Sequence, residues 1–253
     1  MKTLKKGLVF LFSMVLAVNF ANAQDTPTMY VVHTDNVNFN MIPQYEQLAK
    51  SLKENFDKHK IEGVSWTSIT VEDGRYVYVS PIKNMAELDE NPMAAIFDKM
   101  GNEAANKLFN DMDECYDSHS DAIVYHLTSL SYHPEGFSTD GKNHREYHFL
   151  YYAPKDAKAM KEAMAEVKNL FKAKGVKNGY DVFHSGFGSD ESYYMVSIAG
   201  TDDIAIAKGG KENDELLGDE KDAIFFNVIK LTTKYDQVEG EIRPDLSYYP
   251  SKG

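Results

Sequence analysis

The chain has 253 residues and carries 39 acidic against 27 basic side chains, which gives a formal net charge of −12. Only three of the basic residues are arginines, so the chain is poorly equipped to neutralise phosphate groups, and we expect no nucleic-acid partner. The single cysteine, Cys115, excludes an intramolecular disulfide and any Cys-Xaa-Xaa-Cys metal or redox site.

Residues 1–23 have the three regions of a cleaved export signal. Three lysines precede an apolar run over residues 8–18, and Ala21-Asn22-Ala23 matches the small-Xaa-small pattern of a cleavage site. The apolar run is too short to cross a hydrocarbon core of about 30 Å. We therefore expect a protein exported to the periplasm or secreted, with no membrane insertion after cleavage and a net charge of −15.

The first half of the remaining chain shows the patterns of four strands and two helices. Apolar residues at helical spacing from Tyr45 to Phe56 predict the first helix, and Asp73-Gly74 between two β-branched runs predicts a hairpin. In chain order the expected elements are a strand at 29–34, a helix at 44–59, strands at 64–71 and 75–80, a helix at 91–112 and a strand at 122–130. This order is βαββαβ.

The second half repeats the order with one weak point. The expected elements are a strand at 147–152, a helix at 154–173, strands at 180–187 and 192–199, and a last strand at 223–231. Residues 201–222 are acidic and contain Gly209-Gly210, so we expect a truncated helix or an irregular loop there. On this assignment, residues 236–243 belong to an insertion before the C-terminal motif.

Internal repeats support two related halves. Leu130-Ser131-Tyr132-His133-Pro134 returns 116 residues later as Leu246-Ser247-Tyr248-Tyr249-Pro250, and Gly63 falls on Gly179 at the same offset. The polar, glycine-containing stretch 135–143 is the expected boundary. We therefore divide the chain into a signal at 1–23, a first unit at 24–136 and a second unit at 137–253.

A βαββαβ unit is the ferredoxin-like motif, whose sheet has one face that needs a partner. With two such units, the chain resembles the dimeric α/β-barrel superfamily, which includes antibiotic-biosynthesis monooxygenase-like, NIPSNAP-like and EthD-like proteins. The resemblance implies an α+β fold in which two tandem ferredoxin-like units pack sheet to sheet as an intramolecular barrel. It also implies a small-molecule pocket between sheet and helices or within the barrel. Because one chain supplies both sheets, we expect a monomer.

Polar and aromatic side chains on the predicted strands are the candidate pocket residues. Such side chains suit a flat, partly polar ligand, but they also fill cores with their polar tips bonded to neighbours. The candidates are His33, Trp66, Tyr78, His126, His148, His184, Tyr194 and Asn227. Asn227 is included because the strand at 223–231 would place it at a position equivalent to a polar residue of the first half.

The sequence predicts no metal site and no cofactor. His144 and His148, or Cys115 and His119, are four residues apart, but neither pair has a third ligand at a diagnostic spacing. Some proteins of the superfamily that the chain resembles bind haem through a histidine on a helix. The only histidine in the helices expected here is His59, which lies at a helix end.

Two functions stay open at this point. The first is binding of a small aromatic or hydrophobic ligand in the barrel without chemical change. The alternative is a cofactor-independent monooxygenase-like or isomerase-like enzyme, in which His126, His148 or His184 handles a proton and Trp66 or Tyr78 positions the substrate. No catalytic residue is assigned.

Overall fold

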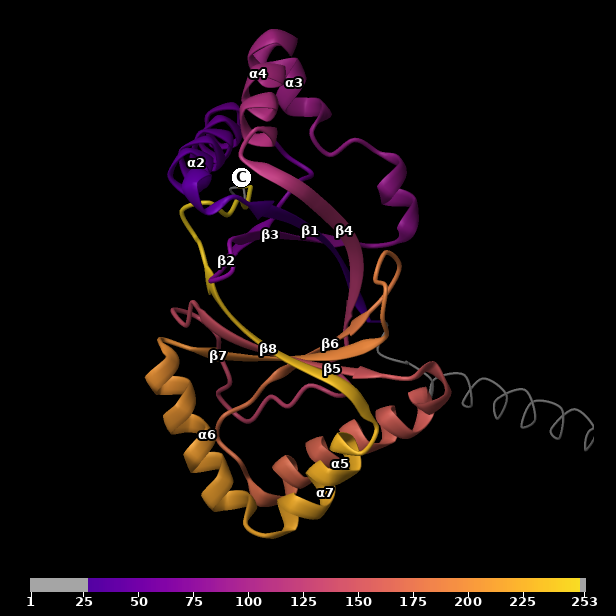
Figure 1. Cartoon of the computed structure of the whole chain (residues 1–253). Helices are drawn as coiled ribbons and strands as arrows, with labels where there is room; N and C mark the ends of the chain where they lie inside the picture. Colours follow the sequence, from indigo (N-terminus) through magenta and orange to yellow (C-terminus); the bar gives the residue numbers. More distant parts are fainter. Residues whose placement is uncertain (1–26, 251–253) are drawn as a thin grey trace, which may run out of the picture.

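The computed structural model describes residues 27–250, so the expected export signal lies outside the described part. Within this part, eight antiparallel strands close into one barrel and six α-helices lie outside it. Figure 1 shows the helices of the first half above the barrel and those of the second half below it. The expected α+β class and the intramolecular barrel of two ferredoxin-like units are confirmed.

The elements follow the order βαββαβ twice, with the second helix of each unit in two pieces. The strands are β1 (Thr28–Val37), β2 (Thr67–Val71), β3 (Arg75–Ile82), β4 (Tyr116–His126), β5 (His144–Tyr152), β6 (Asp181–Ser185), β7 (Tyr193–Gly200) and β8 (Thr232–Ile242). The α-helices are α2 (Ile42–His59), α3 (Ala94–Met100), α4 (Asn102–Asp113), α5 (Ala157–Lys174), α6 (Asp203–Leu217) and α7 (Glu220–Ile229). Short 3₁₀ turns are η1 (Phe39–Met41), η2 (Met85–Asp89) and η3 (Pro154–Asp156).

The two four-stranded sheets join at their edges to close the barrel. Their strand orders are β4-β1-β3-β2 and β8-β5-β7-β6, and the joints are the antiparallel pairs β2 with β8 and β4 with β6. Every described strand therefore has two neighbours, which removes the exposed edges through which sheets associate with other chains. The boundary predicted after residue 136 falls in the connection from β4 to β5.

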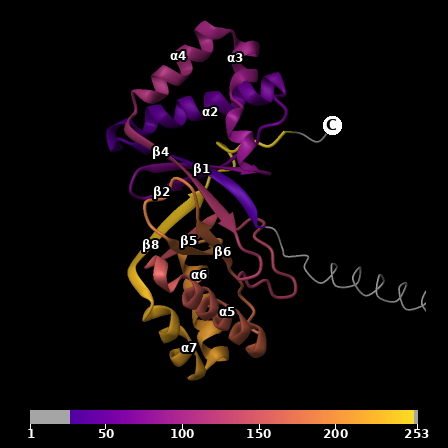
Figure 2. The same ribbon diagram turned by 90° about the vertical axis from the view of Figure 1, so that its right-hand side faces the viewer.

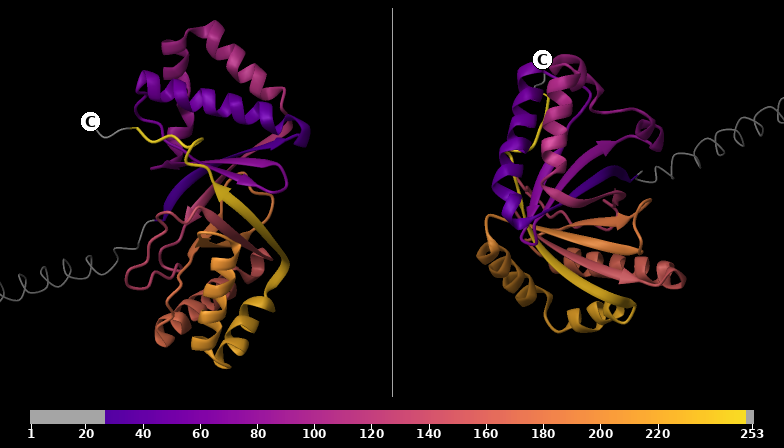
Figure 3. Two further views of the ribbon diagram at one scale, coloured as in Figure 1. Left: turned by 90° about the vertical axis from the view of Figure 1, so that its left-hand side faces the viewer. Right: turned by 45° about the horizontal axis from the view of Figure 1, so that its top comes forward.

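Each unit has a hydrophobic core between its sheet and its helices. Tyr45 and Phe56 of α2 lie in the first core, and Met160 and Phe171 of α5 lie in the second. Figures 2 and 3 show these helix layers on opposite sides of the barrel. No helix in the described part is long and apolar enough to cross a membrane.

Strand alternation decides which side chains face the helices. On β5, Leu150 and Tyr152 pack into the second core, so Glu146 and His148, which have the same parity, also face the helix layer. Tyr147 and its alternate neighbours point towards the barrel interior. The helix side of β5 is thus the side on which a pocket beneath the helices can form.

The repeated Leu-Ser-Tyr segments exchange between the two units, and we call residues 130–132 and 246–248 the clasps. The second clasp, at the end of the second unit, puts Leu246 and Tyr248 into the first core. The first clasp puts Leu130 and Tyr132 into the second core. Each core is therefore completed by residues of the other half.

The contacts of the two clasps are equivalent. Trp66 and Tyr248 exchange backbone N–H···O bonds of 2.9 and 3.0 Å, and Tyr132 and Tyr180 exchange two of 2.9 Å. The serine hydroxyl of each clasp accepts a hydrogen bond from a backbone N–H of the other unit: Ser247 from Ser68 at 2.8 Å, and Ser131 from Val182 at 2.9 Å. This repetition of detail supports the internal duplication more strongly than the sequence identity of the motif does.

The prediction of a last strand at 223–231 was wrong. These residues largely form α7, in which Ile224, Phe225 and Val228 face the second core while Phe226 and Ile229 are exposed. A short apolar run rich in β-branched and aromatic residues does not distinguish a buried helix from a strand. The true last strand is β8, which includes all but the last residue of the stretch 236–243 that was assigned to an insertion.

Other element boundaries also differ from the predictions. Residues 201–222 contain a full helix, α6, whose N-terminus is capped by Asp202, with its carboxylate 2.7 Å from the backbone nitrogen of Ala205. The single helix expected at 91–112 is broken at Gly101, whose φ is 83°. The strand expected at 122–130 begins earlier and ends at His126.

Candidate functional site

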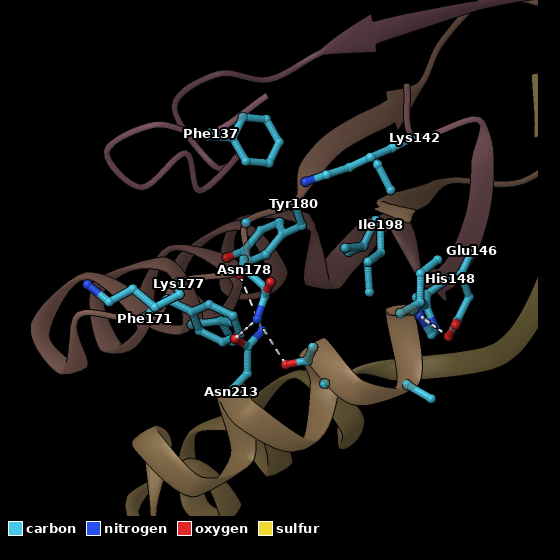
Figure 4. Close-up of a pocket in the computed structure, with 18 of the residues that line it drawn as sticks. Phe137, Lys142, Glu146, His148, Phe171, Lys177, Asn178, Tyr180, Ile198 and Asn213 are labelled. Atoms are coloured by element: carbon cyan, nitrogen blue, oxygen red, sulfur yellow. Dashed lines mark hydrogen bonds and ion pairs between the residues drawn. The ribbon is translucent and has the colours of Figure 1, made fainter. Parts of the chain in front are cut away.

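The described residues line a half-open cavity of about 530 Å³ in the second unit, between the outer face of its sheet and helices α5, α6 and α7. Its walls are mostly apolar and include Leu150, Met164, Phe171, Val196, Ile198 and Val228. The connection around Phe137 covers one end (Figure 4). The size and apolar lining are those of a small-molecule pocket, and its place is outside the barrel rather than in the barrel interior.

One end of the cavity carries a chain of three polar side chains centred on His148. Its Nε2 lies 2.8 Å from Glu146 Oε1, and its Nδ1 lies 2.6 Å from the hydroxyl of Tyr235. Figure 4 shows Glu146 and His148 close together at this end. Both ring nitrogens of His148 therefore have a fixed partner, which holds the imidazole in one orientation.

Burial lowers the pKa of His148 below its ordinary value of 6.5, although the Glu146 carboxylate acts in the opposite direction. The imidazole is therefore neutral at pH 7. With Nε2–H donating to Glu146, the lone pair of the neutral imidazole is on Nδ1 beside the Tyr235 hydroxyl. A proton from a bound molecule would therefore reach His148 through that hydroxyl, and the Glu146 carboxylate would stabilise the resulting cation.

The opposite end of the cavity offers hydrogen-bond donors and positive charge. The hydroxyl of Tyr180 is buried and has no hydrogen-bond partner among the described residues. Burial raises the pKa of Tyr180, so the hydroxyl remains a neutral donor. Lys142 and Lys177 also line the cavity, and within residues 27–250 no acidic side chain forms an ion pair with either. Figure 4 shows the Lys142 side chain extending across the cavity above Tyr180.

The cavity wall at α6 contains a glycine pair. A side-chain carbon added at Gly209 would lie 3.1 Å from Asn178, whose amide donates to the Gly209 carbonyl at 3.2 Å. Asn178 in turn accepts through its backbone carbonyl from Asn213 at 3.3 Å. The close approach of α6 to residue 178 thus fixes one wall of the cavity.

The first unit has a histidine at the position equivalent to His148. His33 and His148 both lie nine residues before the α-helix that follows their strand, at Ile42 and Ala157. The surroundings differ, because Tyr78 lies opposite His33 where Val196 lies opposite His148. The carboxylates of Asp35 and Asp121 raise the pKa of His33 to about 9, against the effect of partial burial.

Of the eight residues proposed from the sequence, His148 lines the cavity. Trp66 is buried between Phe56 and Tyr248 and donates its indole N–H to the Leu246 carbonyl at 2.8 Å. This is the core-filling interpretation that the sequence left open.

The remaining proposed residues are distributed over separate clusters. His184 and Tyr194 lie together in the second unit, where the Tyr152 hydroxyl is 2.7 Å from His184 Nε2. His126 is 2.8 Å from Asp181, as is His133. His33 and Tyr78 lie in the first unit. Asn227 lies on helix α7, not on a strand, and its amide is 3.1 Å from Glu166.

Sequence reasoning missed the partners of His148. Glu146 precedes it by two residues on the same strand, so the Glu-Tyr-His pattern on a predicted strand was a usable signal. Tyr235 was missed because β8 was assigned to an insertion. The cation-binding pairs considered from spacing are also not formed: His144 contacts Glu239 and Glu241, and Cys115 is buried with its thiol 3.4 Å from the Asp111 carbonyl.

No family model and no curated protein matches the sequence, whereas solved structures resemble the chain over most of its length. An anthrone oxidase-like protein has a TM-score of 0.57 at 10% identity, covering 90% of this chain and 95% of that chain. A proposed monooxygenase from Lactobacillus acidophilus gives 0.52 at 9% identity, covering 87% and 94%. A chlorite dismutase from Candidatus Nitrospira defluvii gives 0.50 at 8% identity, covering 88% and 93%. These likenesses show a shared fold.

Proposed function

We propose that this protein binds a small, flat, largely apolar molecule with an oxygen acceptor or an acidic group, in the cavity of the second unit. The observation that carries the proposal is the cavity of about 530 Å³ with apolar walls and donors at one end. The apolar walls match a hydrophobic or aromatic ring system. The unpartnered Tyr180 hydroxyl and the cation of Lys142 supply the donors for its oxygen atoms.

A titration with 8-anilinonaphthalene-1-sulfonate tests this proposal, because the dye combines a flat apolar body with an anionic group. We expect saturable binding of one dye per chain. Ala205→Phe places a ring at the half-buried cavity wall and should weaken binding about tenfold, since two groups competing for one volume cost about 1–3 kcal/mol. Ala159→Phe makes the same change on the exposed face of α5 and should leave binding unchanged. Equal affinities in the two variants would contradict the proposed location.

A second candidate function is a cofactor-independent oxygenase, and the observation that favours it is the Glu146–His148–Tyr235 chain on the cavity wall. The Tyr235 hydroxyl, which also lines the cavity, would take a proton from an acidic C–H group of the bound molecule and pass its own proton to His148 Nδ1, and the carbanion would then react with molecular oxygen. For anthrone as the test substrate, one oxygen molecule converts the CH₂ group to a carbonyl and releases one water. The anthrone oxidase-like and monooxygenase names of similarly folded proteins support the choice of this substrate class.

Oxygen uptake with anthrone as substrate separates the enzyme from the binding protein. We expect His148→Ala to lower the rate by about 10²- to 10⁴-fold, the usual contribution of a positioned general base. His144→Ala is the matched control, since His144 lies on the same strand and face but does not line the cavity. Anthrone oxidation that is equally fast in wild type and His148→Ala would exclude His148 as the base and leave the binding function.

We also propose that the chain is exported after cleavage following Ala23. The basis is the sequence pattern of residues 1–23. Intact-mass measurement of the protein from culture medium and periplasm should show a chain beginning at Gln24. A chain that retains residues 1–23 and stays with the cytoplasmic fraction would contradict export.

A further inference from the structure

Two neighbouring strands of the first unit carry the same short pattern, His-Xaa-Asp. It occurs as His33-Thr34-Asp35 on β1 and as His119-Ser120-Asp121 on β4. The strands are antiparallel and in register, so that His33 lies opposite Asp121 and Asp35 lies opposite His119. Figure 1 shows β1 and β4 side by side under helices α2 and α4. Four side chains with metal-binding chemistry thus share one face of two adjacent strands.

One carboxylate oxygen in this cluster is buried without a hydrogen-bond donor. Asp35 is only 3% exposed, and its Oδ2 accepts from the Tyr45 hydroxyl at 2.5 Å. Its Oδ1 has no partner with hydrogen-bond geometry in the described part, although His33 Nε2 is 3.0 Å away. A buried carboxylate needs full compensation by hydrogen bonds or a cation. His33 Nε2 approaches this oxygen without hydrogen-bond geometry, so the oxygen lacks a directed donor.

The spacing of the ligand atoms suits one bound metal ion. His33, Asp35 and His119 each offer an atom, and these three atoms lie within 4.8 Å of one another. Two ligands with bonds of about 2.1 Å to one ion lie about 3.4 Å apart in a tetrahedral site and about 3.0 Å apart at the right angle of an octahedral site. The separation of 3.0 Å between His33 Nε2 and Asp35 Oδ1 has the latter value.

The groups behind these ligands are arranged to orient them. Asp121 Oδ1 lies 2.8 Å from His33 Nδ1, so the proton of the neutral imidazole stays on Nδ1 and the lone pair of Nε2 is left free to bind an ion. Tyr45 holds the other oxygen of Asp35, and Tyr78 lies 2.8 Å behind the Tyr45 hydroxyl. Carboxylate–histidine–metal arrangements have this second layer of contacts.

We infer that the first unit binds a divalent first-row transition-metal ion through His33, Asp35 and His119. Two imidazoles and one carboxylate favour zinc, cobalt or ferrous iron over calcium and magnesium, which take oxygen ligands. Three protein ligands leave further positions for water or an oxygen atom of a substrate. His119 is exposed, so an ion reaches the site from the surface.

The second histidine–aspartate cluster contains no buried carboxylate oxygen that lacks a partner among the described residues. His126 Nε2 and His133 Nε2 both lie 2.8 Å from the same oxygen of Asp181, so that carboxylate is already paired. The position equivalent to the proposed site in the second unit has also diverged. In the second unit, Leu150 occupies the position equivalent to Asp35, and Tyr235 occupies the position equivalent to His119. The ion site is therefore a property of one unit, and the apolar cavity is a property of the other.

Titration of the untagged, metal-stripped chain with Co²⁺ tests the inference, because cobalt reports its ligands by visible absorption. We expect one Co²⁺ per chain, with absorption bands that are absent in Asp35→Asn. His119→Gln changes an exposed residue, so its fold is checked by circular dichroism, and it should weaken binding at least tenfold. Asp121→Asn should weaken binding about 10- to 100-fold, as for other groups that orient a ligand.

The control variant is His133→Ala, which alters the other cluster and should leave the stoichiometry and the spectrum unchanged. Failure of the wild-type chain to bind Co²⁺ would overturn the inference and leave His33 as a protonated partner of Asp35 and Asp121. Unchanged binding in both Asp35→Asn and His119→Gln would also overturn it, as would loss of binding in His133→Ala.

Discussion

At the scale of single residues, the candidate site depends on the environment of His148. Burial keeps the imidazole neutral, and Glu146 and Tyr235 fix its orientation. A histidine with a lowered pKa in the folded state stabilises the fold most above its unfolded pKa of about 6.5. This contribution is lost as the pH falls through the lower folded-state pKa.

We therefore predict that the ring of His148 titrates below pH 6.5, and that Glu146→Gln lowers the pKa further because it removes a carboxylate that favours the cation. A pH titration by NMR, with the resonance assigned through His148→Gln, measures both values. Glu103→Gln, on α4 in the other unit, should have no effect. A His148 resonance that titrates above pH 6.5 would show that burial does not dominate.

Tyr180 gives a second residue-scale prediction. Its hydroxyl is buried without a partner, so Tyr180→Phe should leave the free energy of unfolding unchanged or raise it slightly. The same variant should bind the anilinonaphthalene sulfonate less tightly by about 0.5–1.5 kcal/mol, the usual net value of one hydrogen bond. Urea unfolding and dye titration measure the two effects. A large loss of stability with unchanged binding would assign the hydroxyl a structural role instead.

The candidate residues predicted from the sequence illustrate what strand alternation can and cannot establish. Strand parity correctly separates neighbours such as Tyr147 and His148. It does not say which helices cover each face or which side chains fill the space between them. His148, Trp66 and His184 were equivalent candidates in the sequence. In the structure His148 lines the cavity, Trp66 fills the first core, and His184 lies within hydrogen-bond distance of Tyr152. Their difference arises from contacts between segments far apart in the chain.

At the scale of elements, the repeat offset was a better guide than local pattern. β4 and β8 are 116 residues apart, the same offset as the two clasps, so the repeat itself places the last strand at 232–242. The local run at 223–231 was read as a strand because it is rich in β-branched and aromatic residues. Its acidic first turn, with Glu220 and Asp222, was a helix-start signal that favoured the observed α7.

Helix α6 provides a prediction at this scale, because two adjacent glycines weaken its middle. A side-chain carbon at Gly210 would meet no atom within 4 Å, so Gly210→Ala should raise the free energy of unfolding by about 0.5–1 kcal/mol. Gly209→Ala should gain less, since its new carbon would crowd Asn178. Urea denaturation of both variants measures the difference. Greater stabilisation by Gly209→Ala than by Gly210→Ala would contradict the packing described for α6.

At the scale of the whole molecule, the exchanged clasps make the two units one cooperative structure. Because Tyr248 completes the first core and Tyr132 the second, neither half retains a complete core alone. Since every described strand is paired within the chain, size-exclusion chromatography with light scattering should give a monomer. A stable dimer would show that another surface mediates association.

The single tryptophan, Trp66, contacts the second clasp directly and reports on this cooperativity. Its fluorescence and the far-ultraviolet circular dichroism should change together during urea unfolding. Tyr248→Ala and Tyr132→Ala should each lower the free energy of unfolding by about 3–5 kcal/mol, the usual range for removing a large buried aromatic ring. Two separate transitions in the wild-type chain would mean that the units unfold independently.

The location of the bound molecule tests the central claim most directly. We propose that the molecule binds in the second unit, outside the barrel, with its apolar body between β7 and α6 and its oxygen atoms near Tyr180 and Lys142. A crystal structure of the chain with 8-anilinonaphthalene-1-sulfonate should show the dye there, within reach of His148. Dye bound inside the barrel beside Tyr147 and Phe149, with the helix-covered cavity empty, would contradict the proposed binding site.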